Sequence, residues 1–546
     1  MKPGPFSSPS PPPPPPNIIR ADAARLHGTR DVTGAVNELE HAKSAATTIE
    51  MEAWRRSRLE LDDEIEPLDA MTAGRSTLVA AAALPLSLAV TIGIDLGTTN
   101  SAVAVLKNGA PVLVPNRRGE LTTPSVVAYT AGGVLVGADA LEQAASNSAN
   151  TVTAAKRFIG RPFDAVGEDA ARVGVAVGAA DGGGVAFAVA AAAPVTPEEV
   201  GAQVLLELLR DVEAFAGEPA SRAVLAVPAY FDDEQRAATL TAAALAGLDE
   251  VTLLAEPVAA CVAHGLSGAT GRVLVFDLGA GTFDVSVVSL GADGDVEVIA
   301  TSGDAHLGGN DFDAALVQWL GDEFGARGAG DDGDAAWQRR LAEAAEAAKV
   351  RLSVLKSVDV QPEGVADGAA VALTRAQLEV LCEPLLQRLR APLYEVALSA
   401  RVALPGESAG EQAEAKHLGM RKKPKKKERR AAAALIPEGT QRRLPLGEAV
   451  SEVVMVGGAS RMAAVRKLVT NLFGVDPRKT VDPMAAVALG ACAHAGALSG
   501  EIDGVRVLQA WQAQLGRILD AARAGVELEK DDAGDEGEEL EQVPDR

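Results

Sequence analysis

The sequence predicts an α/β protein built from two similar lobes. Over residues 91–500, short runs of Val, Ile and Leu bounded by Gly alternate with Ala-rich stretches of helical spacing. Such alternation is typical of sheets covered by helices. One strand–turn–strand motif occurs twice in this region, which indicates a duplicated lobe. With 47% hydrophobic and 23% charged residues, the composition is that of a globular protein.

The clearest elements can be placed by their apolar patterns. Strands are expected at Thr91–Leu96, Val224–Val227, Val273–Phe276 and Val453–Val456. Helices are expected at Pro197–Phe215, Asp233–Ala246 and Trp337–Leu352. We therefore assign residues 91–270 to a first lobe and residues 271–500 to a second lobe.

Residues 1–90 differ from the lobes in composition. Pro11–Pro16 is a run of six prolines, which favours polyproline II and does not join a packed core. The longest apolar run, Thr77–Val90, has 14 residues including Pro85, whereas a membrane-spanning helix needs about 20. We expect a mostly disordered extension, in which this run is a connector rather than a membrane span or a signal peptide.

Charge is distributed unevenly along the chain. The 546 residues carry a formal net charge of −24, which argues against general binding to nucleic acid or anionic membranes. Lys416–Arg430 nevertheless holds nine Lys or Arg and one Glu, within a predicted insertion at about 405–447. We expect a solvated loop there, with a nuclear-import signal or a patch for an anionic partner as alternatives. Residues 501–546 are expected to form one amphipathic helix, within Gly504–Ala524, and an acidic tail.

The cysteines indicate a reducing compartment. Cys261, Cys382 and Cys492 are too few and too far apart for a disulfide framework or a zinc site. Because no convincing sorting signal is present either, the sequence predicts a cytoplasmic protein.

The repeated motif has the residue types of a phosphate-binding turn. IGIDLGTTN at 92–100 and VFDLGAGTFD at 275–284 each place Asp-Leu-Gly at a strand end, before small and hydroxyl residues. Glycine lets backbone N–H groups approach phosphate oxygens, and Thr98, Thr99 and Thr282 add hydroxyl donors. Asp95 and Asp277, 182 residues apart, would bring two carboxylates to the phosphates. Such a pair suits Mg²⁺ bound mostly through its waters.

A third glycine turn adds to this picture. VVMVGGASR at 453–461 is an apolar strand followed by Gly457, Gly458 and the expected start of a helix. Such a turn lets the backbone approach a ribose or a phosphate, although a plain strand-to-helix turn has the same pattern.

These motifs resemble the ATPase domain of the seventy-kilodalton heat-shock chaperone family, within the actin and sugar-kinase superfamily. Beside the three turns, the matching segments are LTTPSVVA (121–128), AAKRFIGRPF (154–163), AVPAYFDDEQRAAT (226–239), LAEPVAACVAHGL (254–266), GDAHLGGNDFD (303–313) and EAAKVRLS (346–353). The resemblance covers about residues 91–500. It implies a two-lobed, actin-like ATPase fold with duplicated ribonuclease-H-like sheets, and ATP or ADP in the cleft between the lobes.

The resemblance also implies roles, carried over by matching position. Lys156 matches the catalytic lysine, which together with Thr282 orients the attacking water. The carboxylates that match those around Mg²⁺ and the expected K⁺ ions are Asp95, Glu256, Asp277 and Asp284. The phosphate cradle would consist of Gly97, Thr98, Thr99, Gly279, Ala280, Gly281 and Thr282, with Gly309 also in the nucleotide site. The adenosine would lie between one helix face, Glu346, Lys349 and Ser353, and a second wall, Gly457, Gly458, Arg461 and Asp482. Pro228 and Arg236 match the family's switch between the lobes, and the implied partners are nucleotide-exchange factors and J-domain-type co-chaperones.

The sequence departs from the family pattern at several points. Ala280, Asn310 and Ala459 stand where Gly, Glu and Ser are usual, and Val350 stands where some members place Arg against the adenine. Ala280 would cost about 1 kcal/mol only if its backbone φ were positive. We expect these changes to tune nucleotide affinity. Because 46 residues follow Gly500, we also expect this chain to lack the family's β-sandwich substrate domain and helical lid.

Three functions follow as hypotheses. The first is an ATP-hydrolysing chaperone-type protein without a recognisable peptide-binding domain. The second is a catalytically weak nucleotide-binding module that regulates other chaperones, which Asn310 and the missing substrate domain motivate. The third is a sugar-kinase-like enzyme on the same fold, which no feature requires and which Lys156 and the adenosine helix argue against.

Overall fold

A computed structural model describes residues 90–190, 192–291, 294, 296–326, 335–364, 370–405, 448–505 and 507. Three sets of predictions concern residues outside these ranges. They are the extension at 1–89, the basic segment Lys416–Arg430, and the helix and acidic tail after residue 507. Within the described ranges, no helix is both long and apolar enough to cross a membrane.

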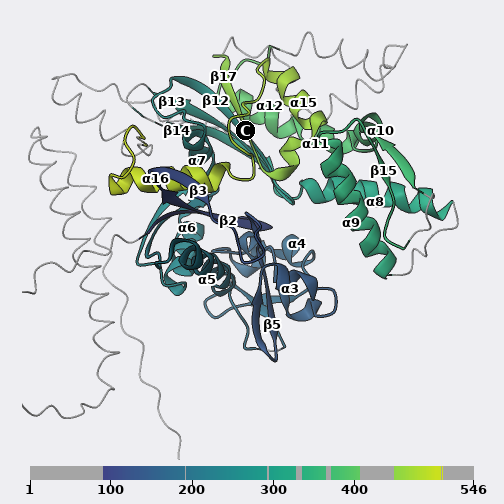
Figure 1. Ribbon diagram of the computed structural model, residues 1–546, viewed down its shortest axis with the longest axis horizontal. Coiled ribbons are helices and arrows are strands. Elements are labelled where there is room, and N and C mark those ends of the chain that lie inside the picture. The colour runs from purple at the N-terminus through teal and green to yellow at the C-terminus, as the bar shows by residue number, and fades with distance from the viewer. Residues whose placement is uncertain are drawn as a thin grey trace, which may run out of the picture. The chain divides into compact units, whose positions relative to one another are not determined.

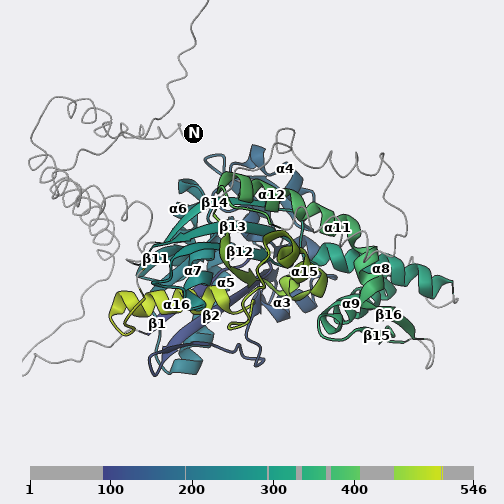
Figure 2. The same ribbon diagram turned by 90° about the horizontal axis from the view of Figure 1, so that it is seen from above.

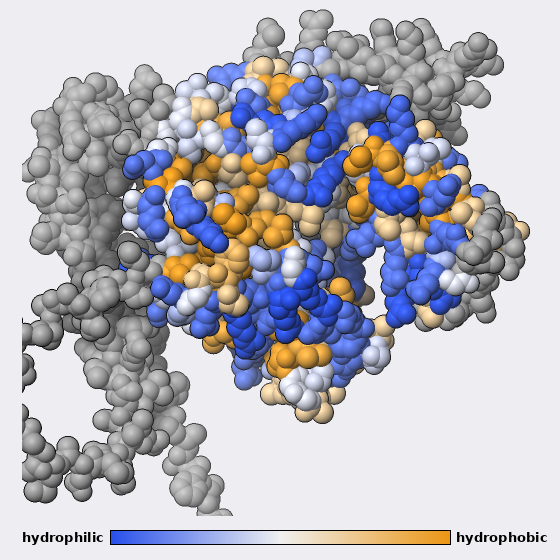
Figure 3. Space-filling model, viewed as in Figure 1, coloured by the Kyte–Doolittle hydropathy of each residue, from blue (hydrophilic) through white to orange (hydrophobic). Residues whose placement is uncertain are grey.

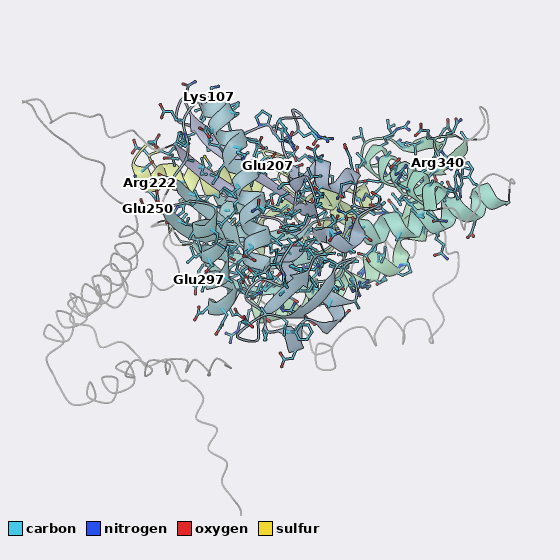
Figure 4. The ribbon with its side chains drawn as sticks, turned by 90° about the horizontal axis from the view of Figure 1, so that it is seen from below. Lys107, Glu207, Arg222, Glu250, Glu297 and Arg340 are labelled. Carbon is cyan, nitrogen blue, oxygen red and sulfur yellow. The ribbon has the colours of Figure 1, made fainter. Side chains whose placement is uncertain are left out.

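The first lobe is built on a mixed sheet whose main strands lie in the order β11-β10-β1-β2-β3, with β4 paired to β2. The strands are β1 (Thr91–Asp95), β2 (Asn100–Lys107), β3 (Ala110–Leu113), β4 (Thr123–Pro124), β10 (Arg222–Val227) and β11 (Glu250–Ala255). β1, β10 and β11 run parallel, whereas β2 returns antiparallel to β1. At the amino ends of β10 and β11, Arg222 and Glu250 form an ion pair of 2.8 Å (Figure 4). The carboxyl ends of the parallel strands therefore lie at the opposite edge, where Asp95 ends β1.

Alternation along β2 assigns one layer of helices to each face of this sheet. Val103 and Val105 belong to a core with α5 (Pro197–Ala216), while Ala102 and Ala104 pack against α16 (Ala486–Ser499). α5 begins at a capping box formed by Thr196 and Glu199, and α6 (Asp233–Leu245) packs beside it.

Smaller elements complete the first lobe. One small sheet contains β5 (Val126–Thr130), β6 (Gly133–Val136) and β7 (Thr151–Thr153), and another contains β8 (Ala176–Ala179) and β9 (Val185–Ala188). The short helical segments are α3 (Ala138–Glu142), η2 (Ser148–Asn150), η3 (Ala155–Arg157), η4 (Phe163–Ala165) and α4 (Gly167–Ala170).

The second lobe repeats this arrangement of strands. Its sheet has the order β14-β13-β12-β17, from β12 (Gly271–Leu278), β13 (Phe283–Leu290), β14 (Val296–Asp304) and β17 (Val450–Val456). β12 pairs antiparallel with β13 and parallel with β17, as β1 pairs with β2 and β10. Phe276 and Phe283 pack against each other in the core of this lobe, with ring centroids 4.7 Å apart and ring planes tilted by 44°. The predicted α/β fold of duplicated, actin-like lobes is confirmed.

The remaining helices of the second lobe fall into two groups. α12 (Arg390–Ser399) and α15 (Ala463–Phe473) contribute to the core beneath the sheet. The others form an arm in which α8 and α9 pack against each other (Figures 1 and 2). The arm consists of α8 (Gly309–Gly325), α9 (Ala335–Leu352), β15 (Ser357–Val360), β16 (Val371–Thr374), α10 (Arg375–Leu381) and α11 (Glu383–Arg388).

The two sheets share one hydrophobic core. Val224 of β10, Val273 of β12 and Val454 of β17 all belong to it. α7 (Glu256–Ala263) and α16 lie within this core and pack closely on each other. At their crossing, a Cβ on Gly490 would lie 1.8 Å from the Ala259 carbonyl oxygen, so only glycine fits. Close packing of small residues therefore joins the lobes.

Candidate functional site

The first glycine turn connects β1 to β2. It follows Asp95 and comprises Gly97, Thr98 and Thr99. A Cβ on Gly97 would stand 2.1 Å from the carbonyl oxygen of Asn100, so the turn requires glycine at this position. The tight turn leaves the hydroxyl-bearing Thr98 and Thr99 lining an adjacent cavity.

A buried serine between β4 and β5 supports this turn. Ser125 donates its hydroxyl to the carbonyl oxygen of Gly97 at 2.8 Å, and its backbone N–H to that of Thr99 at 2.8 Å. The Ser125 hydroxyl also lies 2.8 Å from that of Ser101. Because Ser125 uses its one hydroxyl proton on Gly97, Ser101 is the donor in that pair. The sequence analysis noted the LTTPSVVA segment but did not identify this role.

The second turn connects β12 to β13 and is held from a different side. Gly279 donates its N–H to the Thr282 carbonyl oxygen at 3.0 Å, which closes the turn. At the start of α8, the N–H groups of Gly309 and Asn310 donate to the carbonyl oxygens of Gly279 and Ala280, at 2.9 and 2.8 Å. The first turn of α8 therefore holds the second glycine turn in place.

Ala280 causes no backbone strain in this turn. Among the described residues, the non-glycine residues with positive φ are Asn108, Ala154 and Arg401. Ala280 is not one of them, so the conditional cost considered from the sequence does not arise.

Four acidic side chains and one lysine converge between the turns. Lys156 donates to Glu256 with an Nζ–Oε1 distance of 2.7 Å, and these side chains are only 12% and 13% exposed. The Lys156 ammonium also lies 5.9 Å from the centre of the Phe231 ring. Asp277 of β12 lies opposite Asp284 of β13 in the ladder, and Asp95 ends β1.

This arrangement concentrates negative charge in a dry place. Burial, with Glu256 as the next cause, raises the pKa of Asp95 and of Asp284 to about 7. Burial and the neighbouring carboxylates raise the pKa of Asp277 well above its ordinary value. Burial acts to lower the pKa of Lys156, but Glu256 and Asp95 outweigh it, and the net pKa is raised. One ammonium group thus faces more carboxyl groups than it can neutralise, so the site favours added cations.

The two turns and these charges line one cavity of about 570 Å³. From the predicted site, the residues that line it are Asp95, Gly97, Thr98, Thr99, Lys156, Glu256, Asp277, Gly279, Ala280, Thr282, Asp284, Gly457 and Gly458. The predicted residues that do not line it are Gly281, Gly309, Glu346, Lys349, Ser353, Arg461 and Asp482. Most of the predicted phosphate-binding residues therefore line the cavity, whereas most of the predicted adenosine-binding residues do not.

The residues expected along the adenosine lie on α9 and beside it. Glu346 is exposed, whereas Lys349 is buried and pairs with Asp313 of α8 at 2.5 Å. Ser353 follows the last residue of α9 and donates to the Lys349 carbonyl oxygen at 3.4 Å. The expectation that all three share one helix face is thus met by Glu346 and Lys349 alone.

The opposite wall contains an ion pair. Arg461, which ends η5 (Gly458–Arg461), pairs with Asp482. Burial acts to raise the pKa of Asp482, but the Met484 N–H and Arg461 outweigh it, and the net pKa is lowered. A Cβ on Gly309 would lie 3.3 Å from the Ala459 Cβ and 3.2 Å from Lys349 Nζ, so this wall approaches the arm at Gly309. On the face shown in Figure 3, an opening separates the arm from the part of the first lobe that carries α3 and β5.

Comparison with known protein families agrees with this geometry. The family model described as "Hsp70 protein" matches residues 91–404 and 444–515, which is most of the chain. The chain belongs to the Hsp70 family.

Curated Hsp70-type relatives match over most of the chain. It is 40% identical to "Chaperone protein dnaK" of Cyanidioschyzon merolae over 439 residues, 79% of this chain and 65% of that protein. It is also 40% identical to "Chaperone protein DnaK" of Thermus thermophilus, covering 64% of that protein. A third relative, also 40% identical, is the pea "Stromal 70 kDa heat shock-related protein, chloroplastic", of which 55% is covered. The chain thus spans less than two thirds of the length of these relatives.

A network between the Hsp70 lobes, which sequence reasoning missed, borders the cavity. Arg157 of the first lobe donates to the carbonyl oxygens of Gly281, at 2.8 Å, and of Ala305, both in the second lobe. Asp169 of α4 contacts Arg157 and lies 3.0 Å from His306 Nε2. Burial acts to raise the pKa of Asp169, but His306 and the arginines outweigh it, so its pKa is lowered. No sequence spacing relates Asp169 to His306, because only the closure of the lobes brings them together.

Of the two predicted switch residues, Pro228 lines the cavity and Arg236 does not. Pro228 lines the cavity directly after β10. Arg236 donates to the carbonyl oxygens of Phe231 and Ala229, at 2.9 and 3.5 Å. Arg236 thereby braces the segment after Pro228, and a switching role for the pair remains a prediction.

The metal prediction was for indirect binding, and the geometry is compatible with it. Within the described ranges, no group of three or more His, Cys, Asp or Glu side chains is placed to hold a metal ion directly. Asp95 and Asp277 line the same cavity, and both have raised pKa values. Two carboxyl groups that line one cavity fit a cation that keeps part of its hydration shell.

Proposed function

We propose that this chain binds ATP and hydrolyses it to ADP and phosphate, as the nucleotide-dependent part of a chaperone of the Hsp70 type. The observation that carries the proposal is the pair of Asp-ended glycine turns that line one cavity together with the Lys156–Glu256 pair. Membership of the Hsp70 family supports it. Phosphoryl transfer to water depends mainly on positioning of the reactants and on stabilisation of the developing charge.

Each part of the cavity has a role in this proposal. Thr98, Thr99 and Thr282 hold phosphate oxygens through backbone N–H groups and hydroxyls. Lys156 orients the attacking water and offsets charge on the γ-phosphate, while Glu256 fixes its ammonium group. Asp95 and Asp277 would hold Mg²⁺ through its water ligands, and Mg²⁺ would supply charge neutralisation for the β- and γ-phosphates. Asp284 and Glu256 leave negative charge for a monovalent cation, which we take to be K⁺.

The adenosine would lie beyond the phosphates. We assign its binding to Gly457 and Gly458, with Arg461 and Asp482 on one wall and the face of α9 on the other. Glu346 is the exposed residue on that face, and Ser353 follows the helix. Gly281 and Gly309 belong to the backbone that shapes the second turn.

Whole-chaperone activity is the wider part of the proposal. Client folding, J-domain-type co-chaperones and nucleotide-exchange factors are proposed by family membership, whereas a cytoplasmic location is proposed from the sequence alone. One relative is named as chloroplastic, so a fluorescent fusion with organelle markers is the appropriate test of location.

The experiment that tests the proposal measures nucleotide binding and turnover by the purified chain. Calorimetric titration with ATP and with ADP, each with and without Mg²⁺, is followed by phosphate release under the same conditions. We expect Mg²⁺-dependent binding and slow hydrolysis. Tight binding with no hydrolysis would favour the regulatory alternative instead, and absence of binding would contradict both.

A further inference from the structure

We propose that Asp313 is a positioning residue of the nucleotide site, which orients Lys349 and, through it, the start of α8 and the second glycine turn. The inference deepens the proposed function and rests on it for the nucleotide. It concerns how the arm is connected to the phosphate side of the cavity, and the contacts form a continuous path.

The path begins with a buried ion pair between the two long helices of the arm. Asp313 Oδ2 of α8 lies 2.5 Å from Lys349 Nζ of α9, and the side chains are 15% and 10% exposed. Charged hydrogen bonds in such a dry place are strong and geometrically specific. Removing one partner would leave the other charge buried without compensation, so each side chain determines where the other lies.

Lys349 carries the path from the ion pair to the first residue of α8. Its ammonium donates a second hydrogen bond to the Gly309 carbonyl oxygen at 3.2 Å. An ammonium has three protons, so these two hydrogen bonds leave one donor uncommitted. Within the described residues, the buried Oδ1 of Asp313 has no hydrogen-bond partner, which leaves an acceptor beside that donor.

The start of α8 carries the path onward to the second glycine turn. The N–H groups of Gly309 and Asn310 donate hydrogen bonds to the carbonyl oxygens of Gly279 and Ala280 in the turn. A Cβ on Gly308 would lie 2.4 Å from the Ala280 carbonyl oxygen, which shows how closely the two backbones touch. A change in the Asp313–Lys349 pair must therefore alter the turn that carries Thr282. Asp313 thereby couples a ligand contact at Lys349 to the phosphate side of the site.

The first experiment needs no nucleotide. Hydrogen exchange of the Gly309 and Asn310 amides is measured in the full chain without nucleotide, for the wild type and for Asp313→Asn. We expect exchange about tenfold faster in the variant, because the hydrogen bonds of these amides depend on the pair. Asp322→Asn is the matched control, since it removes the same charge from an exposed position on the same helix. Lys349→Gln, which breaks the pair from the other side, replaces Asp313→Asn should that variant not fold.

The second experiment tests whether Asp313 acts through Lys349. Affinity for Mg²⁺–ADP is measured for the wild type, Asp313→Asn, Lys349→Met and the double variant. We expect each single variant to lose about tenfold and the double variant to lose no more than Lys349→Met alone. Additive losses, or wild-type exchange at Gly309 and Asn310 in Asp313→Asn, would overturn the inference. If the wild type does not bind ADP, the proposed function fails, and the exchange result alone decides the role of Asp313.

Discussion

Single residues in the cavity support the proposal of a charged ligand accompanied by cations. Asp95, Asp277 and Asp284 all have raised pKa values, and burial is the first cause for each. Lys156 donates a hydrogen bond to Glu256 at 2.7 Å. A purely structural core would not retain such a set, because uncompensated buried carboxylates destabilise the fold.

The pH dependence of the free energy of unfolding tests the raised pKa of Asp284. Its pKa rises from 3.8 to about 7 on folding, so the folded state binds a proton that the unfolded state has released above about pH 4. Its contribution is therefore complete at low pH and is lost as the pH rises from about 4 to about 7, by up to about 1.4 kcal/mol per pH unit. Asn mimics the protonated form. In urea unfolding without nucleotide or divalent cations, we expect Asp284→Asn to gain stability relative to the wild type between pH 5 and pH 8. Parallel pH profiles for the two proteins would contradict the shift.

Ser125 gives a second prediction at this scale. Ser125→Ala removes the hydroxyl that fixes Gly97 and leaves a buried carbonyl oxygen and Ser101 without their partner. We expect ATP affinity to fall by about tenfold, because a loosened turn presents its N–H groups less accurately. Ser146→Ala is the control, since Ser146 is exposed and bonds only locally to Gln143. Equal affinities in calorimetric titration of Ser125→Ala and the wild type would remove Ser125 from the site.

Sequence reasoning predicted the residues that carry charge but missed those that support them. Asp95 and Asp277 stand in glycine turns whose residue types indicate phosphate binding, whereas Lys156 was predicted only by its match to the family's lysine. Ser125 and His306 act through contacts with residues far away in the chain, so no local spacing reveals them. The strain considered at Ala280 depended on a backbone angle, which the sequence does not contain.

At the scale of elements, apolar periodicity was a good guide to the buried strands and long helices. The strand expected at Val273–Phe276 is β12, which extends to Gly271–Leu278, and the helix expected at Asp233–Ala246 is α6 at Asp233–Leu245. The short β15 and β16 alternate between buried and exposed positions over only four residues each. So short a pattern is too weak to identify a strand without its partner.

The crossing of α7 and α16 gives a prediction for an element. A Cβ at position 490 would overlap the Ala259 carbonyl oxygen, so Gly490→Ala must push the helices apart. We expect a loss of about 3 kcal/mol or more in the free energy of unfolding, measured with urea. Gly325→Ala is the control at the end of α8, where a Cβ meets nothing within 4 Å, and it should be neutral or stabilising by up to about 1 kcal/mol. Similar midpoints for the two variants would contradict the close crossing.

At the scale of the whole molecule, the sequence predicted that the lobe is duplicated, but it did not predict how the two lobes are joined. The two Asp-Leu-Gly turns predicted two lobes around one cleft, and both turns line the same cavity. α16, by contrast, follows the second sheet in the chain but packs against β1 and β2 of the first. The sequence analysis did not predict this contact, because order along the chain does not say which sheet a helix covers.

The central claim is that the two turns and Lys156 form a working ATPase site. Single-turnover hydrolysis of bound ATP, with Mg²⁺, tests it most directly in the wild type, Lys156→Ala and Lys107→Ala. Lys107 is an exposed lysine near the end of β2 and serves as the matched control (Figure 4). We expect Lys156→Ala to bind ATP yet lose hydrolysis by at least about a hundredfold, while Lys107→Ala behaves as the wild type. Hydrolysis at the wild-type rate by Lys156→Ala would contradict the account.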